Sequence, residues 1–261
     1  MNIIAVDIGN TNITIGLFLK DTEQFIESVP GKSVKKLTET LKSAWDKIPV
    51  AKSSKEGRRD GVIVASSVKP EWTELIGKIA REALDERIYL IGKDIPAPIT
   101  MWVDEPEKVG TDRAVSAAAA YAVVEDAVVI ADFGTAVTID LVDENGIFQG
   151  GVICPGFEIS AQALRKNTAQ LPKVKVKKPD APYGKSTADA INAGLYYSAV
   201  STLQEVIRRY AETIGRWPQT VITGSAAKTI KDDCDFIDSY VPNLVVKGIV
   251  LAYRKYIEQK R

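Results

Sequence analysis

Histidine is absent from the 261-residue chain, and its absence excludes several kinds of chemistry at once. Ser-His-Asp hydrolysis and Cys-His proteolysis need an imidazole base, and catalytic zinc sites commonly use histidine ligands. The two cysteines, Cys154 and Cys234, lack the paired spacing of a zinc site. Chemistry in this protein therefore has to rely on carboxylates, hydroxyls, Lys or Arg, backbone amides and a hard metal ion.

The sequence also lacks a long apolar run and a net charge. No run approaches the ~20 residues that span a bilayer, and no basic segment precedes an apolar one at the N-terminus, which argues against a signal peptide. Lys plus Arg and Asp plus Glu both number 34. We therefore expect a cytoplasmic protein that has neither a nucleic acid nor a membrane as a partner.

What the sequence does contain is an internal repeat. In each copy an apolar run ends at an Asp-x-Gly sequence, and an alternating, strand-like stretch follows. The first copy contains Asp7-Ile8-Gly9-Asn10-Thr11, and the second contains Asp132-Phe133-Gly134-Thr135, 125 residues later. A third strand and a helix complete each copy, so the repeated unit is strand-turn-strand-strand-helix.

The repeat predicts two similar α/β lobes with a ligand cleft between them. We assign residues 1–114 to the N-terminal lobe and residues 115–261 to the C-terminal lobe. The equivalence is approximate, because Thr14-Ile15 and Thr138-Ile139 are out of register by one residue. The second half should end with a helix at 187–213, a strand at 219–223, a helix from Gly224 to about 233 and a helix at 243–258.

The two Asp-x-Gly turns have the composition of a phosphate site. Their backbone N–H groups and the side chains of Asn10, Thr11 and Thr135 can donate hydrogen bonds to phosphate oxygens. The carboxylates of Asp7 and Asp132 suit a magnesium ion, directly or through water. For one such turn an ordinary hairpin is an equally good interpretation. Two turns at matching places favour phosphate binding.

A second candidate site opens an alanine-rich helix predicted at 111–124. From position alone, Thr111 and Asp112 are best explained as helix caps. The helix dipole also favours the ionised form of Asp112, which could then accept a hydroxyl proton. Arg113 is not explained by capping, since cations are disfavoured at helix N-termini. Its guanidinium could hold a carboxylate with two hydrogen bonds, or it could form a surface salt bridge.

Taken together, these segments resemble the motifs of the type III pantothenate kinases. Single matches are weak, but they follow the family's order over nearly the whole chain. Besides the two Asp-x-Gly turns, they are Gly110-Thr111-Asp112-Arg113, Gly150-Gly151 with Pro155-Gly156, Thr168-Ala169-Gln170-Leu171-Pro172, Gly184-Lys185-Ser186-Thr187 and Thr223-Gly224.

The resemblance implies a fold and an activity. The fold would be α/β, with two duplicated ribonuclease H-like lobes of the actin-like ATPase kind, each a mixed sheet flanked by helices. The activity would be ATP-dependent phosphorylation of the primary hydroxyl of pantothenate to 4′-phosphopantothenate, the first step of coenzyme A synthesis. Mg²⁺ with ATP, a monovalent cation (K⁺ or NH₄⁺) and a homodimer are also implied.

The resemblance also implies roles for individual residues. Asp112 would be the general base, and Asp7 and Asp132 would hold metal. The pantothenate site would contain Gly110, Thr111, Asp112, Arg113, Val103, Thr168 and Thr187. The nucleotide site would contain Asp7, Ile8, Gly9, Asn10, Thr11, Asn12, Gly134, Thr135, Thr223 and Gly224.

Three positions depart from the family pattern. Val103 stands where many members have an aromatic residue, and Trp102 is the candidate to compensate. Ser225 follows Thr223-Gly224 where a second glycine is common, so we expect weaker or reoriented ATP binding. Thr111 stands where alanine is more usual, a change that we expect to be harmless.

Two alternative functions stay open on the sequence. One is a kinase of the same superfamily that acts on a sugar or a carboxylate, against which the Gly110–Arg113 motif argues. The other is a non-catalytic nucleotide- or ligand-binding regulatory protein that retains the kinase fold. The complete set of acidic residues argues against this second alternative, and Ser225 keeps it open.

Overall fold

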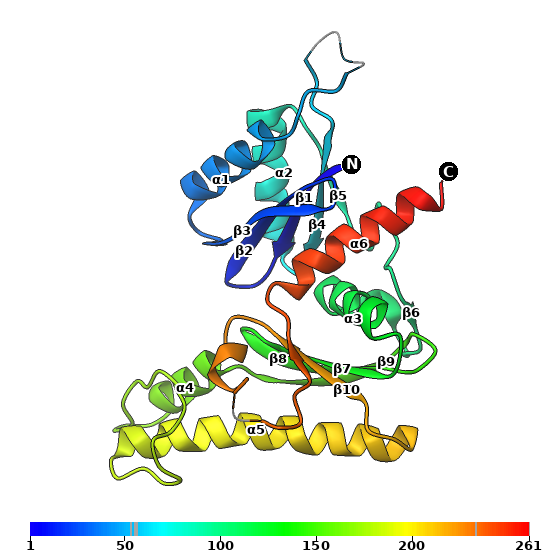
Figure 1. The fold of residues 1–261 in the computed structure, drawn as a ribbon. Helices are drawn as coiled ribbons and strands as arrows, with labels where there is room; N and C mark the ends of the chain where they lie inside the picture. The colour runs from blue at the N-terminus through cyan, green and yellow to red at the C-terminus, as the bar shows by residue number, and fades with distance from the viewer. Residues whose placement is uncertain (53, 55–56, 233, 261) are drawn as a thin grey trace. The chain divides into compact units, whose positions relative to one another are not determined.

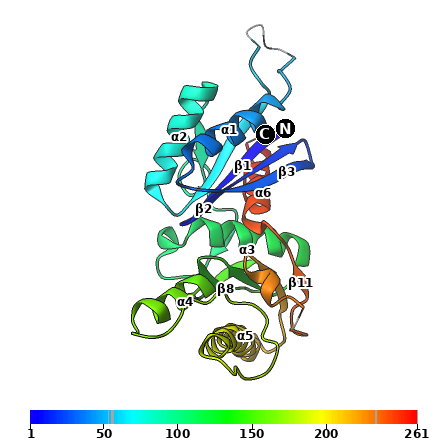
Figure 2. The ribbon, with the colours of Figure 1, turned by 90° about the vertical axis from the view of Figure 1, so that its left-hand side faces the viewer.

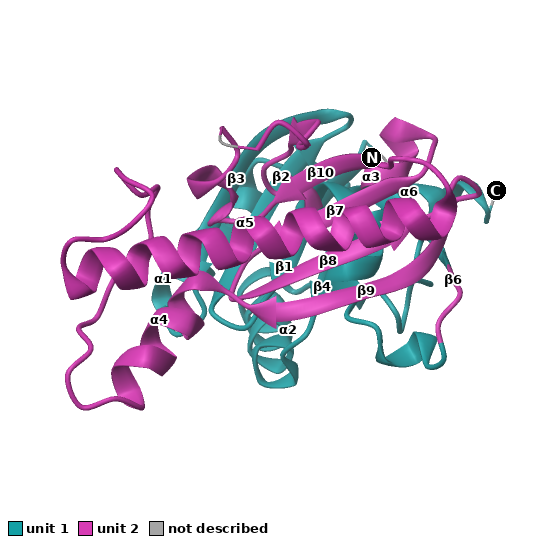
Figure 3. Ribbon diagram, turned by 90° about the horizontal axis from the view of Figure 1, so that it is seen from below, with its two compact units in different colours: residues 1–100, 104–119, 245–261 teal, residues 101–103, 120–244 magenta. Residues whose placement is uncertain are grey.

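The computed structural model describes residues 1–52, 54, 57–232 and 234–260. The chain forms two compact units, which Figure 3 shows in different colours. Unit 1 contains residues 1–100, 104–119 and 245–261, and unit 2 contains residues 101–103 and 120–244. The C-terminal helix thus packs in unit 1. The division at residue 114 concerns the two duplicated halves, and it stays a prediction.

Unit 1 is built on a five-stranded mixed sheet with the strand order β3-β2-β1-β4-β5 (Figure 1). The first three strands form an antiparallel meander, and β4 and β5 extend the sheet in parallel. The strands are β1 (Asn2–Ile8), β2 (Asn12–Leu19), β3 (Thr22–Pro30), β4 (Gly61–Ser67) and β5 (Ile88–Leu90).

Helices cover both faces of this sheet, because alternate residues of the buried strand β1 point to opposite sides. Ile4, Val6 and Ile8 pack under α1 (Val34–Asp46) and α2 (Pro70–Leu84). Ile3 and Ala5 pack with α6 (Leu244–Glu258). Figures 1 and 2 show the ribbon of α6 beside the sheet, on the side away from α1 and α2. The N-terminal part of α3 (Thr111–Val124) joins this second layer through Val115.

Unit 2 is built on a six-stranded sheet with the strand order β11-β10-β7-β8-β9-β6. Its long helix α5 (Thr187–Ile214) covers one face through a core that includes Phe133 and Leu203. The helix α4 (Phe157–Lys166) precedes it. The strands are β6 (Thr100–Met101), β7 (Val128–Phe133), β8 (Ala136–Val142), β9 (Ile147–Pro155), β10 (Gln219–Thr223) and β11 (Ser239–Tyr240).

The two sheets share one topology, which confirms the predicted duplicated α/β fold. The order β3-β2-β1-β4-β5 in unit 1 corresponds to β9-β8-β7-β10-β11 in unit 2. The one-residue offset in the sequence also has a simple cause. The turn after β1 spans residues 9–12, whereas the turn after β7 spans only residues 134–136. Strand pairing absorbs this difference, so that Asp7 pairs with Thr14 and Asp132 with Thr138.

One predicted helix is wrong. After Gly224 the chain forms only the short 3₁₀ helix η2 (Ala227–Thr229), not a helix to about 233, a residue that lies outside the described ones. A competing turn explains the difference, since the carbonyl of Phe133 accepts a hydrogen bond from the N–H of Ala226 over 3.0 Å. The predicted helices at 187–213 and 243–258 and the strand at 219–223 are confirmed. Among the described residues, none of the helices has the length and apolarity to cross a bilayer.

Candidate active site

A row of polar side chains crosses the carboxyl end of the sheet in unit 1. Asp7 on β1 is in register with Thr14 on β2 and with Ser66 on β4. Residues in register on adjacent strands point to the same face, here the face opposite α1 and α2. Asp7 is half-buried and Ser66 is fully buried. This arrangement presents one carboxylate beside two hydroxyls.

The turn after β1 offers exposed hydrogen-bond donors next to this row. The N–H of Gly9 donates to the carbonyl of Asn12 over 3.1 Å, and the N–H of Gly31 donates to the carbonyl of Thr11 over 3.2 Å. These bonds hold the turn, while Asn10, Thr11 and Asn12 remain exposed. Such a turn suits an anionic phosphate. Ile8, by contrast, has a fully buried side chain in the core, so only its backbone can serve the site.

Unit 2 repeats the row with the same chemistry. Asp132 on β7 is in register with Thr138 on β8 and with Thr223 on β10. Thr223 is only 1% exposed, and its hydroxyl accepts a hydrogen bond from the N–H of Leu244 at the start of α6. An aspartate flanked by two hydroxyl residues therefore lies at the same place in both sheets.

Gly224 is required beside Asp132 for two reasons. Its φ of +95° lies in the region that side chains rarely adopt, and an added Cβ would come within 2.4 Å of Asp132 Oδ1. The adjacent turn is closed by the N–H of Gly134, which donates to the carbonyl of Ala136. Thr135 and Ser225 are both exposed. The turn and Thr223-Gly224 thus lie together around one carboxylate.

The helix α4 begins directly against the second turn. The N–H of its capping residue Gly156 donates to the carbonyl of Thr135 over 3.1 Å. A Cβ on Gly156 would lie 2.5 Å from the carbonyl oxygens of Gly134 and Thr135, so only glycine permits this approach. The start of a helix carries unsatisfied N–H groups and positive potential, which favours an anion at this turn.

Gly110, Thr111, Asp112 and Arg113 form the start of α3 in unit 1. The N–H groups of Arg113 and Ala114 donate to the carbonyl of Gly110, and Asp112 Oδ1 accepts a 2.8 Å hydrogen bond from the N–H of Arg113. Asp112 therefore does accept a hydrogen bond from a backbone N–H at the helix start, as the capping interpretation predicts. A Cβ on Gly110 would lie 2.5 Å from Asp112 Oδ1. Glycine at 110 leaves the space that this carboxylate occupies.

Burial raises the pKa of Asp112 above its ordinary value. The N–H and the guanidinium of Arg113 lower this pKa, but by less than burial raises it. The helix dipole alone predicts that the ionised form of Asp112 is favoured, and this prediction is wrong in its net direction because burial outweighs the favourable contributions. A carboxylate with a raised pKa is a better proton acceptor near neutral pH.

Ser66 and Ser67 contact a predicted site residue, Thr111, and were not singled out from the sequence. Thr111 Oγ1 lies 2.8 Å from Ser66 Oγ, and it accepts a hydrogen bond from the N–H of Ser67 over 3.1 Å. A signal for them was present, because two serines follow the apolar run of β4 just as Asp7 follows that of β1. What the sequence did not show is that Thr111, 45 residues from Ser66, would meet them.

The other predicted substrate residues lie in unit 2. Thr168 follows α4 and donates its hydroxyl hydrogen bond to the carbonyl of Leu164 over 2.7 Å. Thr187 is exposed in the first turn of α5. Val103 is half-buried, 3.5 Å from the position of a Cβ on Gly150. Trp102, the candidate to compensate for Val103, is 74% exposed.

The donor set at the two rows fits a hard divalent cation. In the part of the chain that the structure describes, no three carboxylate or thiol side chains gather into a protein cage for a metal. Mg²⁺ does not need such a cage, since it is usually held by one or two carboxylates together with waters and substrate phosphates. Asp7 and Asp132 each have a carboxylate that could serve as one oxygen ligand, and each lies beside a turn that suits phosphate.

The fold and these rows define a class of protein: a duplicated α/β protein with an aspartate beside a glycine-containing turn in each half. Solved structures share the fold. A conserved Campylobacter jejuni protein assigned to the Baf family of transcriptional activators matches with a TM-score of 0.62 at 18% identity, over 98% of both chains. The ethanolamine utilization protein EutJ of Carboxydothermus hydrogenoformans matches at 0.51 and 13% identity, over 97% of this chain and 89% of its own.

Sequence relatives define the family. The model of the type III pantothenate kinase family matches residues 3–209. A type III pantothenate kinase of Agathobacter rectalis is 34% identical over 97% of both chains. Those of Listeria monocytogenes and Dehalococcoides mccartyi are each 30% identical over 97% of this chain, and over 97% and 95% of their own. The chain belongs to the type III pantothenate kinase family.

Proposed function

We propose that this chain transfers the γ-phosphoryl group of ATP to the primary hydroxyl of pantothenate, giving 4′-phosphopantothenate and ADP. The observation that carries the proposal is the Gly110–Arg113 segment, in a chain that matches pantothenate kinases over nearly its whole length. That segment opens a helix and places a half-buried carboxylate of raised pKa beside a guanidinium. These are the groups needed to receive a proton and to hold a carboxylate.

The proposed step assigns one task to each group. Asp112 accepts the proton of the primary hydroxyl as the hydroxyl oxygen forms its bond to the γ-phosphorus. The bond from that phosphorus to the bridging oxygen breaks, and ADP leaves with the electron pair. Arg113 binds the carboxylate of pantothenate, and Val103, Thr168 and Thr187 complete the substrate site. Positioning and charge stabilisation account for most catalysis in phosphoryl transfer.

The nucleotide and its metal fit the two turns. Backbone N–H groups and side chains of residues 8–12 and of Gly134-Thr135 would donate to the phosphates, and Thr223-Gly224 would border the adenosine. Asp7 and Asp132 would hold Mg²⁺, which neutralises charge on the phosphates when bound. A monovalent cation, K⁺ or NH₄⁺, belongs to the same proposal on the family resemblance.

The proposal also covers assembly and location. We expect a cytoplasmic homodimer, with a mass in solution twice the 28.4 kDa of one chain. Sedimentation at several protein concentrations measures this mass directly. A single species at 28.4 kDa over the working range would contradict the homodimer and leave the proposed reaction to be judged by its own assay.

A coupled assay of ADP release tests the proposed function. With Mg²⁺ and K⁺ present, turnover should depend on pantothenate, while glucose and acetate at the same concentration should give only the background rate. Removal of Mg²⁺ by a chelator should abolish turnover, and replacement of K⁺ by Na⁺ should reduce it. Turnover with a sugar or a carboxylate instead would indicate another kinase of the superfamily. Binding of nucleotide without turnover of any acceptor would indicate the non-catalytic alternative.

A further inference from the structure

A compact set of hydroxyl hydrogen bonds joins the start of α3 to the end of β4 in unit 1. Thr111 Oγ1 lies 2.8 Å from Ser66 Oγ, accepts from the N–H of Ser67 over 3.1 Å and donates to the carbonyl of Ser67 over 3.3 Å. If the Ser66 hydroxyl is the donor, Thr111 uses its single hydrogen and both lone pairs. Every hydrogen-bonding position of this side chain is then filled.

The set continues into α2. Ser67 Oγ lies 2.6 Å from Thr73 Oγ1 and accepts from the N–H of Lys69 over 3.2 Å. Thr73 Oγ1 in turn donates to the carbonyl of Lys69 over 3.1 Å. The end of β4 is thereby fixed on two sides, by Thr111 from α3 and by the first turn of α2.

The same end of β4 lies beside the strand that carries Asp7. Ser66 is in parallel register with Asp7, and Ser67 with Ile8. The N–H of Val68 donates to the carbonyl of Ile8 over 3.1 Å. Thr111, which is hydrogen-bonded to Ser66 and Ser67, is therefore linked through β4 to the end of β1, where the turn of residues 9–12 begins.

We propose that Thr111 and Ser66 form a hydroxyl clamp, a pair of positioning residues that holds Asp112 in a fixed place relative to the end of β1. The inference rests on the proposed function, and it adds a role that the side chain of Thr111 was not expected to have. Asp112 is the next residue after Thr111, in the first turn of α3. The first N–H groups of a helix have no acceptor in a preceding turn. The clamp supplies the missing anchor.

Kinetics of matched variants test the clamp. Thr111→Val keeps the branched shape and removes the hydroxyl, and it should lower kcat about 10- to 100-fold while the KM for pantothenate changes less, since misplacement of a reacting group acts on the transition state. Thr111→Ser keeps the hydroxyl and should recover most of this loss. Ser66→Ala with Thr111→Val should be no worse than the stronger single variant, because the bond that Ser66→Ala removes is already lost in Thr111→Val.

Ser116→Ala is the matched control. Ser116 lies on the same helix, and its buried hydroxyl has no hydrogen-bond partner among the described residues. This variant should keep the wild-type kcat. If Thr111→Val keeps the wild-type kcat as well, or differs from wild type only in its unfolding temperature, the clamp does not position Asp112 and the proposal is overturned.

Amide hydrogen exchange separates this proposal from the proposed function. In Thr111→Val the amides of residues 110–114 should exchange faster than in wild type and in Ser116→Ala, whether or not the enzyme turns over. A wild-type protein without turnover would sink the proposed function alone. Unchanged exchange at 110–114 in Thr111→Val would sink the clamp alone.

Discussion

At the scale of single residues, a glycine leaves space for an aspartate in both units. A Cβ on Gly110 would lie 2.5 Å from Asp112 Oδ1, and a Cβ on Gly224 would lie 2.4 Å from Asp132 Oδ1. The two aspartates differ in their proposed tasks, since Asp112 receives a proton and Asp132 holds metal. In both cases the glycine has no side chain, so the carboxylate can lie against the backbone. Substitutions at the aspartate or at the glycine can therefore separate effects on activity from effects on folding.

Asp112→Asn tests the proposed general base. We expect turnover to fall by ~10²–10⁴-fold, because the amide cannot accept the hydroxyl proton. The variant should still fold, since the amide oxygen can accept the hydrogen bond from the N–H of Arg113 that Asp112 accepts now. Steady-state kinetics and circular dichroism measure the two effects. Unchanged turnover would remove Asp112 from the mechanism.

The raised pKa of Asp112 also predicts how stability depends on pH. A carboxylate whose pKa is higher in the folded protein stabilises the fold below its unfolded pKa, ~3.9, and this contribution is lost as pH rises through the folded pKa. Asp112→Asn should therefore unfold at a higher temperature than wild type at neutral pH, and the difference should shrink as the pH is lowered toward 4. A variant less stable than wild type at neutral pH would contradict the burial of this charge.

Gly224→Ala tests the approach of the backbone to Asp132. At a φ of +95° an L-residue is strained by ~1–2 kcal/mol, and its Cβ would also meet Asp132 Oδ1. We expect the KM for ATP to rise about tenfold or more, which corresponds to ~1.4 kcal/mol of lost binding, because the added Cβ displaces the carboxylate that is proposed to hold the metal of ATP. Gly215→Ala is the control, because Gly215 has a φ of +75° with nothing within 4 Å of its Cβ position. It should lose stability and keep its KM for ATP.

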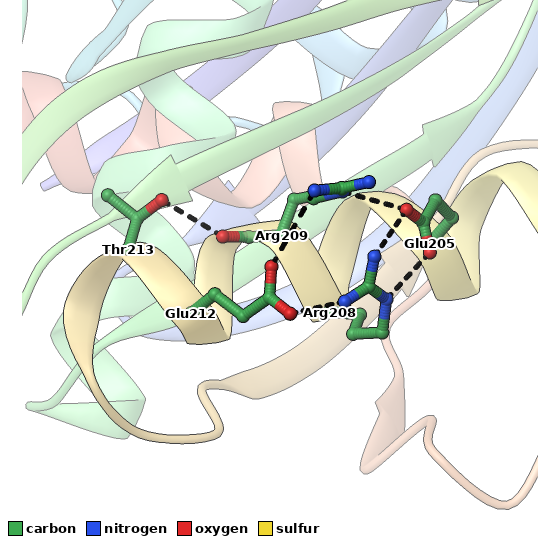
Figure 4. Close-up of polar contacts among 5 residues, drawn as sticks. All are labelled: Glu205, Arg208, Arg209, Glu212 and Thr213. Carbon is green, nitrogen blue, oxygen red and sulfur yellow. Dashed lines mark hydrogen bonds and ion pairs between the residues drawn. The ribbon is translucent and has the colours of Figure 1, made fainter.

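At the scale of the element, the long helix α5 carries an exposed ion-pair network (Figure 4). Glu205 accepts hydrogen bonds from Arg208 over 2.6 and 2.7 Å and from Arg209 over 2.8 Å. Arg208 also pairs with Glu212 one turn further on. The hydrogen bonds from Arg208 and Arg209 lower the pKa of Glu205 to about 2. The ionised form of Glu205 therefore stabilises the helix.

Glu205→Gln tests this network through acid unfolding. The pKa of Glu205 is depressed in the folded state, so its stabilising contribution is complete above the unfolded pKa, ~4.3, and is lost as pH falls toward about 2. In the variant, the unfolding midpoint should fall less steeply over this range. At neutral pH the effect should be small, as for exposed pairs generally.

A second glutamate serves as the control for this measurement. Glu39 on α1 is exposed and lies 4.0 Å from its partner Lys35. Glu39→Gln removes one exposed carboxylate from a pair with a lysine, so it controls for the loss of a single surface charge. If Glu205→Gln and Glu39→Gln behave alike, the hydrogen bonds of Arg208 and Arg209 do not stabilise the helix in acid.

Elements with a local signal were predictable from the sequence. The strand ends at Asp7 and Asp132 were visible because an apolar run stops at a charged residue and a glycine follows. The helix predicted after Gly224 failed because a turn held by Phe133 competes there, the carbonyl of Phe133 accepting from the N–H of Ala226. That contact comes from a strand about 90 residues earlier in the sequence, so no local sequence pattern predicts it.

The candidate site was also predictable from the sequence only in part. The residues of the two turns follow from the repeat, whereas the partners of Thr111 do not, because Ser66 and Thr111 are joined only by the fold. The raised pKa of Asp112 was likewise out of reach, since burial is a property of packing and not of position in a helix. The sequence predicts which residues carry the chemistry, and the structure shows which contacts hold them in place.

At the scale of the whole molecule, the central claim is that the duplicated fold catalyses one defined transfer. Phosphorus and proton NMR of a reaction with ATP, Mg²⁺, K⁺ and pantothenate tests this claim most directly, with Asp112→Asn as the control. We predict one new phosphomonoester on the primary hydroxyl of pantothenate, formed in equal amount with ADP and nearly absent in the variant. A folded, ATP-binding protein that leaves pantothenate unmodified would contradict the account.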